Sequence, residues 1–368
     1  MFHTPLASAF SRVYPTRLER SNFKRTTNEI ALRTKEPLVK VGIIGAGRIG
    51  AIRADILSGH RDVSSIVVTD EIPAQSQRIA AATGAIVASG PDELLEAVDA
   101  VIICTPADMH VNYIELAIGA GVPALCEKPL ATNLADADRA VAAVSKGGVQ
   151  VQIGFNRRFD DGYRSARALI ADGSLGTVTL IIGQHHDHEV ASREYIERSG
   201  DEFHDQLIHD FDILRFVTGR EVVRVHAAGA TRGFDWFAEY GDFAQTVVTL
   251  WLDDGTLAVL CGSRQDPVGY DVRMEVFGTE DSIAVGLDER TPLRSVEQGV
   301  VHPANPYTEW IPRFGKTYTL EMDAFLDMVL NDGPNDCTVQ DARTALVIAE
   351  ACSLSASEGR IVTLEEVV

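Results

Sequence analysis

The stretch VGIIGAGRIG at residues 41–50 constrains the fold more than any other segment of the chain. A β-branched apolar run, typical of a strand, leads directly into three spaced glycines, and a helical pattern follows them. In this context the first glycine allows a tight turn, the second lets the backbone approach a pyrophosphate, and the third allows close helix packing. We therefore predict a dinucleotide-binding loop. Its residues are Gly45, Ala46, Gly47, Arg48, Ile49 and Gly50.

An acidic residue predicts which dinucleotide binds. Asp70 ends the next predicted strand, SSIVVTD, 20 residues after Gly50. A carboxylate at that place accepts hydrogen bonds from the adenosine ribose and repels a 2′-phosphate, and the residue that follows is Glu71 rather than an arginine. We expect NAD as the cofactor, with NADP disfavoured.

The order of the predicted elements indicates the fold class. Up to residue 155, strands alternate with helices of about 10–13 residues, which implies right-handed crossovers and a parallel sheet. After residue 155 several long strands follow one another without helices between them, and DDGT at 253–256 is a hairpin signal. We predict an α/β protein: a Rossmann domain at 40–155, and at 156–368 an α+β domain with an open, mainly antiparallel sheet that binds substrate and forms a homodimer or homotetramer.

Charge and composition narrow the function classes. The net charge is −20, and residues 41–368 alone carry 25 basic and 50 acidic groups, a balance that opposes binding to nucleic acid or anionic membranes. No apolar run reaches the roughly 20 residues of a membrane-spanning helix, and the five cysteines are scattered without a C-x-x-C pair. We expect a cytoplasmic protein with reduced thiols. Residues 1–39 are predicted to be a flexible extension; a transit peptide and an early start codon are the alternatives.

The segment FHDQLIHDFD contains a candidate general base. Asp205 and His209 are four residues apart, so they share one face of a continuous helix. A carboxylate that holds a histidine in one tautomer is a common way to make a proton acceptor. The competing interpretation is a solvated polar helix face.

Four segments together, VGIIGAGRIG, CEKPLA, VQIGFNRRFDDGY and FHDQLIHDFD, resemble the Gfo/Idh/MocA oxidoreductase family, and most of all its inositol 2-dehydrogenase branch. The resemblance covers residues 40–368. It implies that Lys128 binds the reacting hydroxyl, that His209 accepts its proton and that Asp205 completes the network. Glu127 either contacts the cofactor or forms a structural salt bridge.

The resemblance also implies binding residues. Those expected on the nicotinamide side are Thr105, Pro106, His110 and Glu127. Those expected to contact substrate are Arg157, His185, Asp187 and Tyr270. Val268 departs from the second aromatic that is common two residues before Tyr270 in inositol dehydrogenases, which leaves the polyol open.

The segment QHHDHE at 184–189 suggests a metal site, but successive strand residues face opposite sides, so at most two of them can meet one ion. We predict no metal. The predicted activity is NAD-dependent oxidation of a secondary hydroxyl of a cyclic polyol or sugar. The alternatives are another sugar or sugar-nucleotide oxidoreductase, an NAD-dependent glycosidase, or a regulator that senses NAD and a sugar without turnover.

Overall fold

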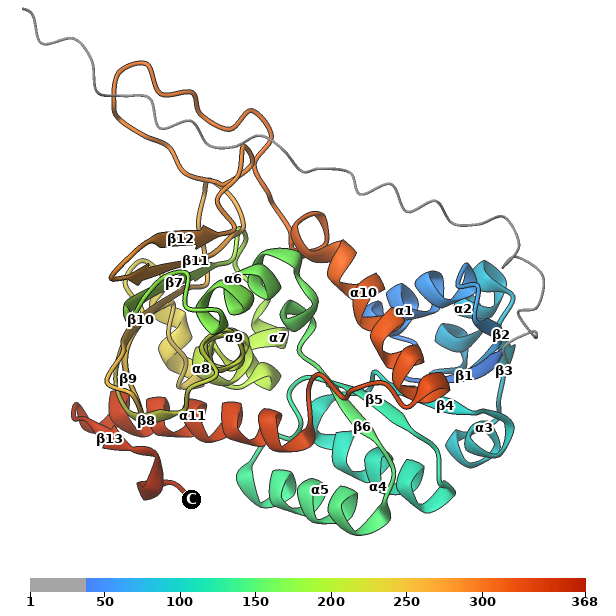
Figure 1. Cartoon of the computed structure of the whole chain (residues 1–368). Helices are drawn as coiled ribbons and strands as arrows, with labels where there is room; N and C mark the ends of the chain where they lie inside the picture. Colours follow the sequence, from blue (N-terminus) through green and yellow to red (C-terminus); the bar gives the residue numbers. More distant parts are fainter. Residues whose placement is uncertain (1–37) are drawn as a thin grey trace, which may run out of the picture. The chain divides into compact units, whose positions relative to one another are not determined.

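The structure is a computed structural model that describes residues 38–368 (Figure 1). The predicted extension therefore lies outside the described residues, except for its last two positions. The first strand already begins at Val39. Within the described residues, no helix combines the length and apolar character needed to cross a bilayer.

The first sheet has six strands, all parallel, in the order β3-β2-β1-β4-β5-β6. This is the doubly wound order expected of a Rossmann domain, so the prediction for the N-terminal half is confirmed. The strands are β1 (Val39–Ile44), β2 (Val63–Thr69), β3 (Ile86–Val87), β4 (Ala100–Ile103), β5 (Ala124–Glu127) and β6 (Val151–Gly154). The helices between them are α1 (Arg48–Ser58), α2 (Pro73–Thr83), α3 (Pro91–Ala97), α4 (His110–Ala120) and α5 (Leu134–Gly147).

The second sheet has seven strands in the order β12-β11-β7-β10-β9-β8-β13. The β10–β7 pair is parallel and the other neighbours are antiparallel, as the run of successive strands predicts. The turn at 253–256 joins β9 to β10, and Gly255 adopts φ 90° there. The strands are β7 (Val178–His186), β8 (Val222–Ala230), β9 (Gln245–Leu252), β10 (Leu257–Ser263), β11 (Asp271–Gly278), β12 (Ser282–Val285) and β13 (Val362–Thr363).

Helices cover one face of the second sheet. On β9 the residues that point toward them, such as Val248 and Leu250, are fully buried, whereas the alternate residue Val247 is 50% exposed. The helices after β6 are α6 (Asp161–Ala171), α7 (Arg193–Ser199), α8 (Glu202–Asp205), α9 (Ile208–Thr218), α10 (Trp310–Asn331) and α11 (Val339–Glu358). Short 3-10 helices lie at Ala107–Met109, Asn156–Phe159, Asp235–Tyr240 and Leu364–Glu366.

The last two helices connect the two sheets. Helix α10 follows the second sheet in sequence, yet Met322, Phe325 and Leu326 pack into the core of the first sheet, and α10 contacts α1 (Figure 1). Helix α11 contributes Leu346 to a core around the first sheet and Ile348 to the core of the second. Residue 155 therefore separates the two sheets along the sequence, but α10 and α11 pack on the first sheet although they follow this residue.

Candidate active site

The glycine loop joins β1 to α1, and Gly45 and Gly50 each have a steric reason to be glycine. Gly45 adopts φ 98°, and a Cβ there would lie 2.6 Å from the backbone of Cys104. A Cβ on Gly50 would lie 2.0 Å from the carbonyl oxygen of Gly45. By contrast, no atom of residues 38–368 lies within 4 Å of the place where a Cβ on Gly47 would be, at the N-cap of α1. The open space falls where a pyrophosphate would approach, so these residues fit a dinucleotide.

Asp70 shapes this loop from the end of β2. Its Oδ2 accepts a hydrogen bond from the N–H of Ala46 at 2.6 Å, and its Oδ1 accepts one from the N–H of Ile72 at 2.8 Å. Arg78, on α2, donates to the carbonyl of Ala46 at 3.1 Å. The carboxylate therefore lies beside the glycine loop, as the spacing in the sequence predicts.

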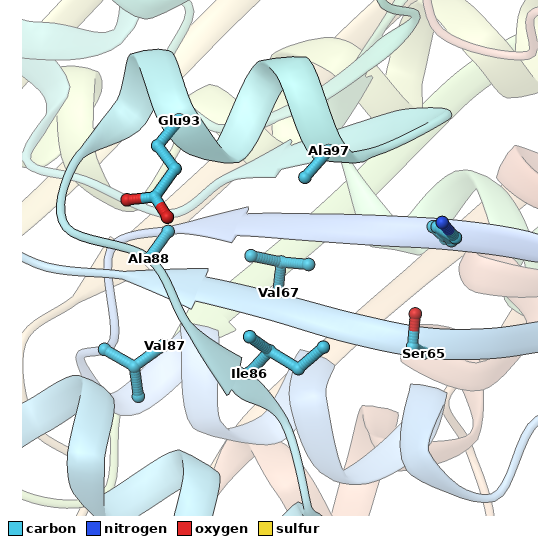
Figure 2. A pocket seen from close by; sticks show the side chains of 8 residues that line it. Ser65, Val67, Ile86, Val87, Ala88, Glu93 and Ala97 are labelled. Carbon is cyan, nitrogen blue, oxygen red and sulfur yellow. The ribbon is translucent and has the colours of Figure 1, made fainter.

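One large cavity connects the two halves of the described chain. It measures about 1460 Å³ and runs from Arg48 and Ile49, beside the glycine loop, to Lys128 and His209. Sites for small molecules usually occupy roughly 300–1,000 Å³, so this one has room for a dinucleotide and a second ligand. A second hollow of about 160 Å³, between α3 and strands β1 to β3, is far smaller (Figure 2).

Asp205 is held by three donors in this cavity. Lys128 Nζ lies 3.5 Å from Oδ1 and donates to the Asp205 backbone carbonyl at 2.8 Å. Tyr195 donates to Oδ1 at 2.8 Å, and Arg264 donates to Oδ2 at 2.7 Å. Burial alone would raise the pKa of Asp205, but the charges of Lys128 and Arg264 outweigh it and hold that pKa below its usual value.

The structure differs from the expected Asp205–His209 pair. The helix is interrupted at residues 206–207, with Asp205 ending α8 and His209 in the first turn of α9. Both oxygens of Asp205 are already occupied by donors from Lys128, Tyr195 and Arg264. Since the two residues lie on different helices, the rule that residues i and i+4 of one helix share a face does not apply to them.

His209 lies between aromatic rings at the cavity wall. Its ring is 5.7 Å from that of Phe155 and 6.3 Å from that of His185, measured between centroids, and its Nδ1 has no hydrogen-bond partner among residues 38–368. Burial lowers the pKa of His209 well below its usual value, and the charges of Lys128 and Arg157 lower it further. The ring is therefore neutral at pH 7 and able to accept a proton.

Asp210 and His185 form a buried carboxylate–histidine pair beside His209. Asp210 Oδ2 lies 2.7 Å from His185 Nδ1, and Arg157 Nη1 donates to Asp210 Oδ1 at 2.9 Å. All three side chains are at most 5% exposed. Burial and the charge of Arg157 lower the pKa of His185 to about 4, so it stays neutral. The sequence analysis did not select Asp210 as a site residue, although it directly follows His209 in the segment FHDQLIHDFD.

Three further predicted substrate residues line the same cavity. They are Arg157, Asp187 and Tyr270. Burial raises the pKa of Asp187 to about 6, although the charge of Arg264 opposes that shift. The Tyr270 ring packs edge-on against His185 with 5.9 Å between centroids. This places an aromatic face, a carboxyl group and the neutral His185 around one space.

The neighbouring histidine belongs to a different group. His186, Asp266 and Asp271 bring ligand atoms within 4.8 Å of one another. Asp271 is already held by Arg273 Nε at 2.8 Å and 3.1 Å. A cation at this point would compete with that guanidinium, so the donor set does not favour a metal ion.

Glu127 and His110 shape the nicotinamide side expected from the sequence. Glu127 Oε1 accepts from Arg53 Nε at 3.0 Å and from Nη2 at 2.7 Å, which is the salt bridge that we kept as an alternative to cofactor contact. His110 is buried, with its Nδ1 2.7 Å from the carbonyl of Pro129 and its Nε2 2.9 Å from that of Thr105. It therefore bridges the loops after β4 and β5, while Thr105 itself lines the cavity.

Comparisons with known proteins agree with this geometry. The model of an oxidoreductase family with an NAD-binding Rossmann fold, GFO/IDH/MocA, matches residues 39–155, and the model of a GFO/IDH/MocA C-terminal domain matches residues 163–284. The myo-inositol dehydrogenase Hyg17 of Streptomyces leeuwenhoekii is 36% identical over 87% of this chain and 98% of its own length. The inositol 2-dehydrogenase of Rhizobium meliloti is 32% identical over 89% of this chain and 99% of its own.

A solved structure is also similar. The scyllo-inositol dehydrogenase of Lactobacillus casei, crystallised with NAD(H) and scyllo-inositol, superimposes with a TM-score of 0.82. The two sequences are 27% identical, and the match covers 89% of this chain and 99% of that one.

Proposed function

Because the chain belongs to the GFO/IDH/MocA oxidoreductase family, we propose that it oxidises a secondary hydroxyl of an inositol or a related cyclic polyol with NAD⁺. Membership confirms the resemblance, the fold class and the NAD cofactor predicted from the sequence. One observation carries the proposal: a single cavity is lined by the glycine-loop side chain Arg48 at one end and by Lys128 and His209 at the other.

The residues of this cavity divide the chemistry between them. NAD⁺, when bound, supplies the acceptor for the hydride. Lys128 is positioned to hold the substrate oxygen and to stabilise its growing negative charge, since Asp205 fixes the ammonium group in place. In this proposal neutral His209, which lines the same cavity, takes the hydroxyl proton. The neighbouring positive charges favour later release of that proton from His209.

The charges in the site favour a neutral substrate. Lys128 is paired with Asp205, and Arg157 is paired with Asp210, so a carboxylate already balances the charge of each cation. Asp187 adds a carboxyl group that repels anions when ionised. Hydroxyl groups, which both donate and accept hydrogen bonds, suit this mixture of paired charges. We therefore favour polyols and neutral sugars over sugar acids and phosphates.

The uncovered face of the second sheet supports self-association. On adjacent strands, Trp251 of β9 lies opposite Leu257 of β10, and Leu257 lies opposite Leu180 of β7. Leu257 is 39% exposed and Val247 is 50% exposed. A contiguous apolar face of this kind favours burial against a second copy of the chain, as a homodimer or as part of a homotetramer.

Variants of the two central residues test the mechanism. Lys128→Ala and His209→Ala should each lower kcat by roughly 10²- to 10⁴-fold, because each removes a group that acts on the transferred proton or the developing charge. The affinity for NADH, measured by calorimetry, should stay within a few fold of wild type. Near-normal turnover in either variant would contradict the assigned role.

A further inference from the structure

A single buried guanidinium serves two buried carboxylates beside the active site. Arg53, on α1, is fully buried. Its Nη2 lies 2.7 Å from Glu127 Oε1 at the end of β5 and 2.5 Å from Glu321 Oε2 on α10. The side chain of Glu127 is 12% exposed and that of Glu321 is 0% exposed. Three elements distant in sequence therefore meet in one charge cluster, which we define as Arg53, Glu127 and Glu321.

This cluster has one more carboxylate than it has cations. When both carboxylates are ionised its net charge is −1, and a proton bound to it makes it neutral. Burial raises the pKa of Glu321 to about 7; Arg53 lowers that pKa and Glu127 raises it. The Tyr318 ring covers Arg53 at 4.7 Å, and the thiols of Cys104 and Cys337 lie near enough to be affected by the same charges. The cluster can thus change its charge near neutral pH.

The cluster reaches the cavity through Glu127. That residue lines the cavity beside Lys128, at the carboxyl end of a parallel strand, where ligands of doubly wound sheets bind. The oxidised nicotinamide ring is positively charged and the reduced ring is neutral. A net charge of −1 attracts the first and has little effect on the second.

We propose that Glu321, acting through Arg53 on Glu127, is a positioning residue that sets the relative affinity of the site for the oxidised and reduced forms of the dinucleotide. The inference rests on NAD binding and not on the identity of the polyol. Because NAD⁺ favours the ionised cluster, its affinity rises as the pH rises through neutrality and its binding releases a proton. The affinity for NADH does not rise with pH, and NADH binding releases no proton.

Calorimetric titrations with NAD⁺ and NADH at pH 6 and pH 8 test this. In the wild type, NAD⁺ affinity should be roughly three- to tenfold higher at pH 8, the effect of one charge across a partly solvated cavity, and NADH affinity should change less than twofold. In Glu321→Gln the pH dependence for NAD⁺ should shrink to the part that Asp187 contributes. Asp187 also titrates near this range in the same cavity, so the comparison between wild type and variant isolates Glu321.

Asp323→Asn is the matched control, since it removes an acid that is half exposed on the same helix and paired with His60. It should behave as the wild type does. If Glu321→Gln does not fold, the test is proton release by the wild type, measured by calorimetry in buffers of different ionisation enthalpy. We expect roughly 0.3–0.5 proton released per NAD⁺ bound near pH 7, and none per NADH bound. Equal pH dependence for both cofactors, or an unchanged dependence in Glu321→Gln, would overturn the proposal. If no polyol is oxidised but NAD⁺ binding shows the expected pH dependence, the result contradicts the proposed substrate and not the proposed role of Glu321.

Discussion

At the scale of single residues, the active site depends on how Asp205 is held. Its carboxylate accepts hydrogen bonds from Tyr195 and Arg264 and lies beside Lys128, so it is kept ionised and in turn fixes the ammonium group. His209 has none of these partners and is neutral because it is buried among positive charges. In the proposed mechanism the two residues therefore have separate roles: Asp205 fixes Lys128, and His209 accepts the proton.

Tyr195→Phe tests this arrangement. Loss of one donor should raise the pKa of Asp205, so the ionised form would be lost at a higher pH as the solution is acidified. We expect the acid limb of the pH profile of kcat/KM to move to higher pH, while kcat/KM at pH 8 stays near that of the wild type. The measurement is the pH profile of kcat/KM. Tyr307→Phe, which loses a similar bond to Asp288 away from the cavity, is the control. Identical profiles for Tyr195→Phe and wild type would contradict the account.

The candidate site could be predicted in part from the sequence. Lys128, Asp205 and His209 were selected from motifs, and the structure brings all three to one cavity. That Asp205 is held by Lys128, Tyr195 and Arg264 could not be predicted, because periodicity does not reveal the break at 206–207. Arg264 and Tyr195 belong to no local motif, so only the folded structure shows that they contact Asp205.

At the scale of elements, two substitutions in the glycine loop should have different effects: one should weaken NAD binding and the other should lower the stability of the fold. Gly47→Ala places its methyl group in open space at φ −68°, so the fold should keep its stability within about 1 kcal/mol while NAD affinity falls at least tenfold. Gly50→Ala directs its methyl group against the carbonyl of Gly45, so it should lower the free energy of unfolding by more than about 2 kcal/mol. Urea unfolding and calorimetric NAD titration measure the two effects. Normal NAD binding by Gly47→Ala would show that the space is not a phosphate cradle.

The elements show what pattern reasoning can and cannot supply. Both sheets were predicted because their strands are apolar, bounded by turn signals and ordered differently in the two halves. Helix α10 begins at Trp310 and packs on the first sheet, although it follows the second sheet in sequence. An amphipathic pattern shows that a helix has a buried face, but it does not show which sheet covers that face.

At the scale of the whole molecule, the open sheet face predicts the assembly. Val247→Glu places a charge in the middle of that face, so it should convert a dimer or tetramer into smaller species at micromolar concentration. Leu287→Glu, which alters a 64% exposed residue after β12, should leave the assembly intact. Sedimentation velocity distinguishes the species. A monomeric wild type would contradict the prediction.

The central claim is NAD-linked oxidation of a neutral cyclic polyol, and it is tested most directly by NADH formation. The purified full chain would be assayed with NAD⁺ and with NADP⁺ against inositol isomers, neutral pyranoses, sugar acids and sugar phosphates. We predict turnover concentrated among the inositols or neutral sugars, with NAD⁺ preferred because Asp70 lies beside the glycine loop. Tight NAD binding without turnover of any polyol or sugar would contradict the claim and favour a sensor or a cofactor-recycling glycosidase.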